Sequence, residues 1–204
     1  MVNPVLAALG FLIGFLCGSV PFGYLAGVIN QIDIRKHGSG NIGFTNVQRI
    51  LGLKWALPVL VLDSAKGVLP VIFARSFNLV PLTVGIGAVL GHIFTPWLKF
   101  NGGKGVATTI GVAALLCPRS LLWSLLLFLI ILFITGYVSL ASISLALALP
   151  VMTFFFYRAQ LSLLLFTIVI AIIIIYRHIS NIRRLLSHRE PKFGLWLRVF
   201  GKSL

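Results

Sequence analysis

The fold is decided by the stretch LLWSLLLFLIILFI at residues 121–134, and by a second, LSLLLFTIVIAIIIIY, at residues 161–176. Neither contains a charged side chain, and their lengths approach the roughly 20 residues with which a helix crosses a bilayer. Of the 204 residues, 59% are hydrophobic and 10% are charged, and the mean hydropathy is +1.07. Soluble domains have about a quarter of their residues charged. The sequence therefore predicts an all-α integral membrane protein.

Seven segments are predicted to cross the membrane, giving a bundle of about seven transmembrane helices. Among them, the shortest is residues 105–117, and Pro21 and Pro150 predict kinks in two others. The full set is residues 4–29, 55–74, 79–98, 105–117, 120–135, 138–156 and 160–176.

The basic residues predict the orientation of these spans. The chain has 17 Lys and Arg residues against 3 Asp and Glu, a formal net charge of +14. With the N-terminus outside, most of the basic residues lie in the inner segments, as the positive-inside rule requires. The C-terminus is then cytoplasmic. The same cations could hold an anionic substrate or a lipid headgroup, whereas nucleic acid is disfavoured because no basic face alternates with exposed aromatic residues.

Four polar segments interrupt the apolar pattern, and on this topology all of them lie at the inner membrane surface. We therefore expect them to form one cytoplasmic pocket. They are residues 35–49, 99–109, 139–142 and 177–184.

Two of these segments are rich in glycine and adjoin basic residues. Residues 38–46 read GSGNIGFTN, in which backbone N–H groups and polar side chains can approach an anion. Residues 102–105 read GGKG and open into a predicted helix, whose N-terminus favours phosphate. The second is not a Walker A loop, because Leu98 and Gly105 stand where that motif requires Gly and Ser or Thr. Each stretch alone reads as a turn; together they favour phosphate binding.

Ionisable residues within predicted spans are costly and often functional. Asp63 and Lys66 are one helical turn apart, which predicts a buried ion pair, and His92, near the end of the third span, is expected to hydrogen-bond to a neighbouring loop. His178 and Asn181 share a helix face just below the last span.

Several kinds of site are not expected. Three acidic residues are too few for a carboxylate-rich metal site, and no histidine begins the H-x4-D pair in which an aspartate holds a catalytic base. Cys17 and Cys117 have no metal-binding spacing and read as buried apolar residues. No metal or other cofactor is predicted.

Five motifs carry a family resemblance: GSGNIGFTNVQR at 38–49, VLDSAKG at 61–67, GHIFTPWLKFNGGKGVAT at 91–108, VSLAS at 138–142 and YRHISNIRRL at 176–185. In order and spacing they resemble the acyl-phosphate-dependent glycerol-3-phosphate acyltransferases of bacterial inner membranes. The resemblance implies a seven-helix bundle that transfers a fatty acyl group from acyl phosphate to glycerol 3-phosphate, giving lysophosphatidic acid and phosphate in phospholipid biosynthesis. It also implies an active site facing the cytoplasm, contact with membrane lipid, and other phospholipid-synthesis enzymes as candidate partners.

The resemblance also assigns candidate residues. Those implied to be catalytic are Ser39, Arg49, Lys104, His178 and Asn181. Those expected to bind substrate or its phosphate are Gly38, Gly40, Asn41, Thr45, Asn46, Gly102, Gly103, Gly105, Thr108 and Ser142.

The hypothesis is direct attack of the glycerol hydroxyl on the acyl carbonyl, with phosphate as the leaving group. Lys104 and the Gly102 and Gly103 amides would hold the departing phosphate, and Arg49 and Ser39 a substrate phosphate. His178 and Asn181 would orient glycerol 3-phosphate. The proton acceptor is either His178 or a substrate phosphate, and the phosphate is slightly favoured because no carboxylate is evident to fix the His178 tautomer.

Two positions depart from the family pattern: Phe44 replaces a small residue, and His188 replaces a glycine before Glu190. Residues 1–193 are predicted to form one membrane-embedded acyltransferase domain, and residues 194–204 a basic interfacial tail. Two alternatives remain open: a membrane transporter of phosphate-bearing anions, and a lipid-binding scaffold without catalysis.

Overall fold

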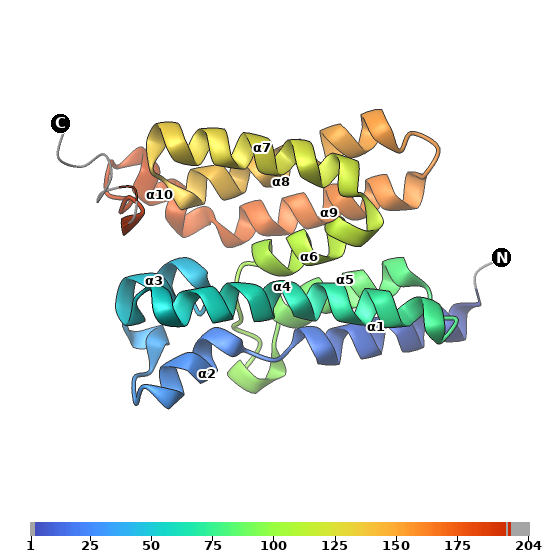
Figure 1. The fold of residues 1–204 in the computed structure, drawn as a ribbon, viewed down its shortest axis with the longest axis horizontal. Coiled ribbons are helices and arrows are strands. Elements are labelled where there is room, and N and C mark those ends of the chain that lie inside the picture. The colour runs from blue at the N-terminus through green and yellow to red at the C-terminus, as the bar shows by residue number, and fades with distance from the viewer. Residues whose placement is uncertain (1–2, 195, 197–204) are drawn as a thin grey trace. The chain divides into compact units, whose positions relative to one another are not determined.

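The computed structural model describes residues 3–194 and residue 196, and every regular element in that part of the chain is helical. The chain divides into two compact units, residues 1–116 and residues 117–204. Figure 1 shows the first unit in blue to yellow-green and the second in yellow to red.

The first unit contains six α-helices and two short 3-10 helices, η1 and η2. Helix α1 packs along α5, while α4 packs against α3, α5 and α6. Their bounds are α1 Pro4–Gly18, α2 Phe22–Ile29, η1 Ile34–Lys36, α3 Phe44–Leu51, α4 Leu53–Ser76, α5 Pro81–Ile93, η2 Pro96–Leu98 and α6 Val106–Leu116.

Helices α1 and α5 are in close contact because small residues face each other across their interface. A Cβ atom at Gly14 would collide with the carbonyl oxygen of Val84, and one at Gly91 with that of Phe15. The glycines spaced four residues apart thus allow the two backbones to approach closely, as is common in membrane helices.

The second unit is built from α7 Pro118–Thr135, α8 Val138–Phe156, α9 Leu161–Arg177 and α10 Ile179–Leu186. Helix α8 packs against both α7 and α9, and α10 contacts α8 and α9. Between α9 and α10 the chain bends by 57° at His178.

Five helical segments of the described chain are long and apolar enough to cross a membrane, and the bent pair α9–α10 makes a sixth if it counts as one span. They coincide with six of the seven predicted spans. Helix α6 matches the remaining one, but its 11 residues reach only about 16 Å at 1.5 Å per residue. Its crossing, and the orientation that depends on it, stay predictions.

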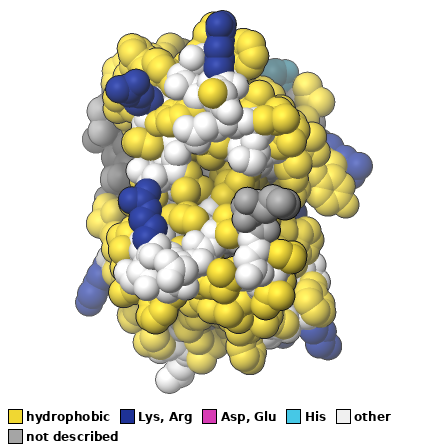
Figure 2. Space-filling model, turned by 90° about the vertical axis from the view of Figure 1, so that its right-hand side faces the viewer, with side chains coloured by type: hydrophobic (Ala, Val, Ile, Leu, Met, Phe, Trp, Pro, Cys, Tyr) yellow, Lys and Arg dark blue, Asp and Glu magenta, His cyan; other side chains and the backbone are white. Residues whose placement is uncertain are grey.

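The surface matches a membrane environment. Figure 2 shows one face of the molecule, where hydrophobic side chains predominate and the Lys and Arg side chains stand singly. Large apolar side chains on the helices are widely exposed, among them Phe133 at 65%, Ile134 at 67% and Ile172 at 62%. So much exposed apolar surface is unfavourable in water and suits lipid contact.

Pro21 does more than bend the first predicted span, because it separates α1 from α2. Pro150 instead lies within a continuous α8. The polar segment that follows α2 also contains a helix, α3. The apolar residues of this segment pack against those of α2, α4 and η2. This shared core consists of Ala26, Ile34, Ile42, Val47, Ala56, Val59 and Leu98.

Candidate functional site

The glycine-rich loop at residues 38–43 turns through two left-handed positions before α3 begins. Gly38 has φ +60° and Gly40 has φ +70°, values that glycine adopts without the penalty a side chain would bring. The Gly40 N–H donates to the His37 carbonyl over 3.0 Å. The backbone is thus held in a compact turn, with Ser39 on its exposed side.

Asn46 braces this loop from below. It is 2% exposed, and its Nδ2 donates to the carbonyls of Ile34, over 3.2 Å, and His37, over 3.1 Å. Its Oδ1 accepts the Ser39 N–H over 2.9 Å and Arg49 Nη1 over 3.4 Å. Because both amide hydrogens of Asn46 are donated to carbonyls of the segment just before the loop, the geometry favours a bracing role over the predicted contact with phosphate.

The remaining predicted residues of this loop and of α3 differ in exposure and contacts. Arg49 and Ser39 have exposed side chains, while Thr45 is half-buried. Asn41 Oδ1 accepts the Gly43 N–H over 2.9 Å, which shapes the entry to α3. Arg35, by contrast, donates two hydrogen bonds to Asp33 and lowers the pKa of that carboxyl to about 2.

The second glycine-rich loop, residues 102–105, rests on the end of α5 and leads into α6. The Gly102 N–H donates to the Ile93 carbonyl over 3.0 Å, and the Gly103 N–H to the His92 carbonyl over 3.1 Å. Lys104 is half-buried, and Gly105 is left-handed with φ +86°. The predicted lysine therefore lies just before a helix N-terminus, with Gly105 between it and α6, an arrangement that favours phosphate binding.

Thr108, in the first turn of α6, points away from any solvent-facing site. Its side chain is fully buried, and Oγ1 donates to the Asp63 carbonyl over 2.9 Å. The hydroxyl therefore ties α6 to α4. The predicted ion pair beneath it is confirmed, since Lys66 Nζ lies 2.8 Å from Asp63 Oδ1.

In the second unit, His178 occupies the junction of α9 and α10. The ring is 2% exposed, and Nδ1 lies 2.8 Å from the Ile174 carbonyl oxygen. A carbonyl can only accept, so Nδ1 carries the hydrogen and Nε2 holds the lone pair of the neutral ring. This backbone contact fixes the tautomer of His178. The sequence had shown no carboxylate that could do so.

Asn181 is held by a carboxylate that the sequence did not single out. Its Nδ2 donates to Glu190 Oε1 over 2.6 Å, while Arg184 Nε lies 2.6 Å from Oε2. Burial raises the pKa of Glu190, but the hydrogen bonds from Asn181 and Arg184 outweigh it and hold the pKa below its usual range. Glu190 thereby fixes α10 to the chain that follows it.

Ser142 is 5% exposed, and its hydroxyl donates to the Val138 carbonyl one turn earlier in α8. The structure thus places Ser39, Asn46 and Arg49 around one loop of the first unit, with Lys104 on another. His178 and Asn181 occupy one helix junction of the second unit.

The two departures from the family pattern have different structural consequences. Phe44 begins α3 and packs on the shared core beneath the loop, so it contributes packing. His188 has φ +54°, a left-handed conformation, and follows Ser187, the C-cap of α10. Glycine suits such a position best, which explains why a glycine is usual there.

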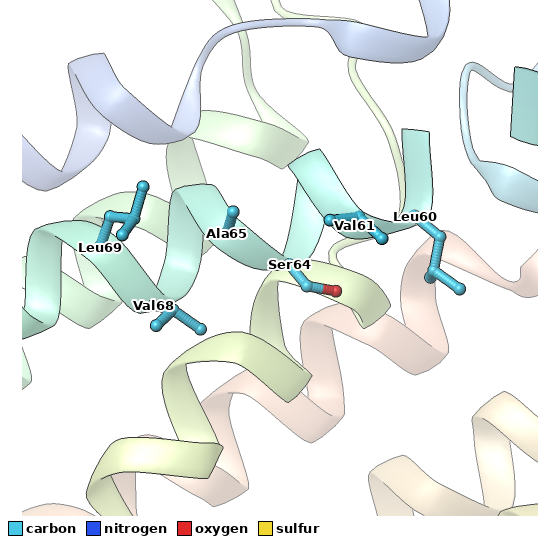
Figure 3. A pocket seen from close by; sticks show the side chains of 6 residues that line it. All are labelled: Leu60, Val61, Ser64, Ala65, Val68 and Leu69. Atoms are coloured by element: carbon cyan, nitrogen blue, oxygen red, sulfur yellow. The ribbon is translucent and has the colours of Figure 1, made fainter. Parts of the chain in front are cut away.

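A cavity of about 370 Å³ lies along one side of α4 (Figure 3). Its lining is apolar except for the Ser64 hydroxyl and includes no Lys or Arg side chain, so the cavity does not suit phosphate. It is lined by Leu60, Val61, Ser64, Ala65, Val68 and Leu69. Across the described residues, no group of three or more His, Cys, Asp or Glu side chains could hold a metal ion.

The chain is similar to a known protein family over most of its length. The family model described as glycerol-3-phosphate acyltransferase matches residues 8–188. The glycerol-3-phosphate acyltransferase of Desulforudis audaxviator is 42% identical over 185 residues, covering 89% of this chain and 93% of the relative. That of Bacillus subtilis is 39% identical over 196 residues, covering 95% and 100%.

Two crystal structures of PlsY (YgiH), an integral membrane glycerol 3-phosphate acyltransferase, are also similar. The glycerol 3-phosphate form has a TM-score of 0.86 at 40% identity and covers 95% of this chain and 98% of its own. The lysophosphatidic acid form has a TM-score of 0.81 at 40% identity and covers 92% and 95%. The chain is a multi-pass membrane protein and belongs to the glycerol-3-phosphate acyltransferase family.

Proposed function

We propose that this protein transfers a fatty acyl group from acyl phosphate to glycerol 3-phosphate, releasing lysophosphatidic acid and phosphate. The observation that carries the proposal is the similarity of nearly the whole chain to PlsY in its glycerol 3-phosphate and lysophosphatidic acid forms, which name the acceptor and the product. The acyl phosphate donor, the bacterial inner membrane and a cytoplasmic active site belong to the proposal, as does the action of residues 1–193 as one domain.

Phosphate binding is assigned to the two glycine-rich loops. Acyl phosphate and glycerol 3-phosphate each carry up to two negative charges, which repel each other strongly in a partly desolvated site. Arg49 and Lys104 supply positive charge, and Ser39 an exposed hydroxyl. Lys104 and the amides of its loop would hold the departing phosphate, while Arg49 and Ser39 position the phosphate of a substrate.

The reaction needs no covalent acyl-enzyme, because acyl phosphate is already activated. The glycerol hydroxyl oxygen forms a bond to the acyl carbon, the bond from that carbon to the phosphate oxygen breaks, and the electron pair leaves with phosphate. The hydroxyl proton passes to an acceptor. His178 and Asn181 would orient glycerol 3-phosphate for this attack.

Two groups can accept the proton. The Ile174 carbonyl leaves the lone pair of His178 on Nε2, which suits a general base. A substrate phosphate, with a second pKa near 6, suits it equally. If a His178→Gln variant retains most of its turnover, His178 is not the base; a rate that does not change with pH through the phosphate pKa argues against the phosphate.

The decisive experiment uses purified protein in lipid vesicles with glycerol 3-phosphate and either palmitoyl phosphate or palmitoyl-CoA. The proposal predicts equal amounts of phosphate and lysophosphatidic acid from palmitoyl phosphate, and none from palmitoyl-CoA. Product from palmitoyl-CoA but not from palmitoyl phosphate would show that acyl phosphate is not the donor. No product from folded protein with either donor would overturn the activity.

A transporter of phosphate-bearing anions is the second candidate, favoured by the break between α1 and α2 beside buried charges, a feature of transport sites. Against it, the groups at that break are engaged within the protein. Lys66 Nζ donates to the Val20 carbonyl over 2.7 Å, and Thr95 Oγ1 to the Ser19 carbonyl over 2.6 Å. Flux of glycerol 3-phosphate into vesicles without acyl transfer would favour the transporter.

A further inference from the structure

A cluster of three buried ionisable side chains lies next to the loop that carries Lys104. Asp63, Lys66 and His92 are 2%, 6% and 4% exposed. Lys66 Nζ is 2.8 Å from Asp63 Oδ1, and His92 Nδ1 approaches the same oxygen to 3.6 Å. Burying such groups is costly unless they are paired, so their positions require an explanation beyond packing.

Lys66 has a structural task that accounts for it. The break at Pro21 leaves the Val20 carbonyl outside any helical ladder, and Lys66 donates to it over 2.7 Å. Asp63 compensates the charge of Lys66 in return. This pair would be complete without His92, whose ring also faces Asp63.

The other edge of the His92 ring supports the glycine turn before Lys104. A Cβ atom at Gly103 would collide with Nε2 and its neighbouring ring carbon, which places the Gly103 backbone directly against the imidazole. The Gly103 N–H also donates to the His92 carbonyl. One residue therefore holds this turn both by its main chain and by its ring.

The far end of the loop is tied to the same cluster. Thr108 donates from the first turn of α6 to the carbonyl of Asp63 over 2.9 Å. The backbone from Gly102 to Thr108 is thus anchored at both ends to a pair, Asp63 and His92, whose side chains face each other. Any rotation of the ring would displace Gly103 and, next to it, Lys104.

We propose that His92, oriented by Asp63, is a positioning residue that sets the Gly102–Gly105 loop so that Lys104 and the loop amides meet a substrate phosphate. This inference rests on the proposed function. The ring acts on the substrate only through Gly103 and Lys104. Displacement of a substrate-binding group by about 1 Å can cost on the order of a hundredfold in rate.

The test compares two side chains of different reach at this position. His92→Asn keeps a donor near Asp63 but is too short to support Gly103, whereas His92→Gln extends toward the place of Nε2. Because Lys104 and its loop are assigned to the departing phosphate, we expect His92→Asn to raise the KM for palmitoyl phosphate about tenfold, with the KM for glycerol 3-phosphate within twofold. His92→Gln should recover most of that loss, within threefold of the wild type.

Thr153→Val is the matched control, because Thr153 is buried in α8 and its hydroxyl donates to the Leu149 carbonyl of the same helix; both KM values should stay within twofold. Wild-type KM values in both folded His92 variants would overturn the inference, even if their Tm falls. If neither folds, Asp63→Asn tests it instead, with an expected threefold rise in the same KM; no rise would overturn it. An inactive wild type would refute the proposed function instead.

Discussion

The two compact units hold their candidate residues by different means. In the first unit these residues lie on two loops and in the helices that follow them, and a buried side chain supports each loop, Asn46 under one and His92 under the other. In the second unit His178 and Asn181 lie where two helices meet, held by the Ile174 carbonyl and the Glu190 carboxylate. Loops need internal braces because they lack a helical ladder, whereas a helix junction needs only its end fixed.

The largest effect on stability is expected at the ion pair of the first unit. Asp63→Ala leaves Lys66 charged and buried, and breaking such a pair costs about 3–5 kcal/mol. The double variant Asp63→Ala/Lys66→Met should recover part of this loss. Thermal unfolding in detergent measures both; equal Tm values for wild type and single variant would show that the pair does not stabilise the unit.

A smaller loss is expected from the brace under the first loop. Asn46→Leu keeps the side-chain volume but leaves the carbonyls of Ile34 and His37 without this donor. Both carbonyls keep a backbone donor, so each lost hydrogen bond costs about 0.5–1.5 kcal/mol; Tm should fall, and kcat/KM should fall further as Ser39 and Arg49 lose their support. Unchanged kcat/KM at a lowered Tm would separate the brace from the site.

Glu190 should give the second unit a pH dependence in stability. Its folded-state pKa lies below its usual value, so the stability it contributes is present above the ordinary glutamate pKa of about 4.3. That contribution is lost as the pH falls through the lower folded-state pKa. Glu190→Gln should lower Tm at neutral pH and have less effect at pH 3. A Tm difference that grows on acidification would contradict this sign.

The smallest effect is a gain in stability at the end of α10. His188 is left-handed with φ +54°, a conformation that costs a non-glycine residue about 1 kcal/mol. His188→Gly removes that cost and should raise Tm slightly, without changing kcat. A lower Tm would mean that the greater freedom of glycine in the unfolded chain outweighs the relief.

The sequence predicted the helices well because their signal is long and redundant. An apolar run such as residues 121–134 predicts a helix without any knowledge of its neighbours. The ion pair of Asp63 and Lys66 follows from their separation of one helical turn. The length of α6 was the difficult part. Its apolar pattern resembles that of a span, but the helix ends at Leu116, before Pro118 begins the next one.

The candidate site was predictable only in its local parts. Glycine turns and an adjacent lysine are visible in sequence, but the bracing role of Asn46 depends on carbonyls nine and twelve residues away. The partner of His178 is a main-chain oxygen, which residue types do not reveal. Glu190 could have been found as the only acidic residue among many basic ones near the C-terminus.

The most direct test of the account compares two lysines of the first unit. Lys104 follows the glycine turn at the start of α6, and Lys54 lies exposed in the first turn of α4. With palmitoyl phosphate and glycerol 3-phosphate, Lys104→Ala should lower kcat/KM by a factor of about 10²–10³, the scale of losing a charge-stabilising donor. Lys54→Ala should stay within twofold. Equal losses in both variants, or none in Lys104→Ala, would contradict a phosphate site at this loop.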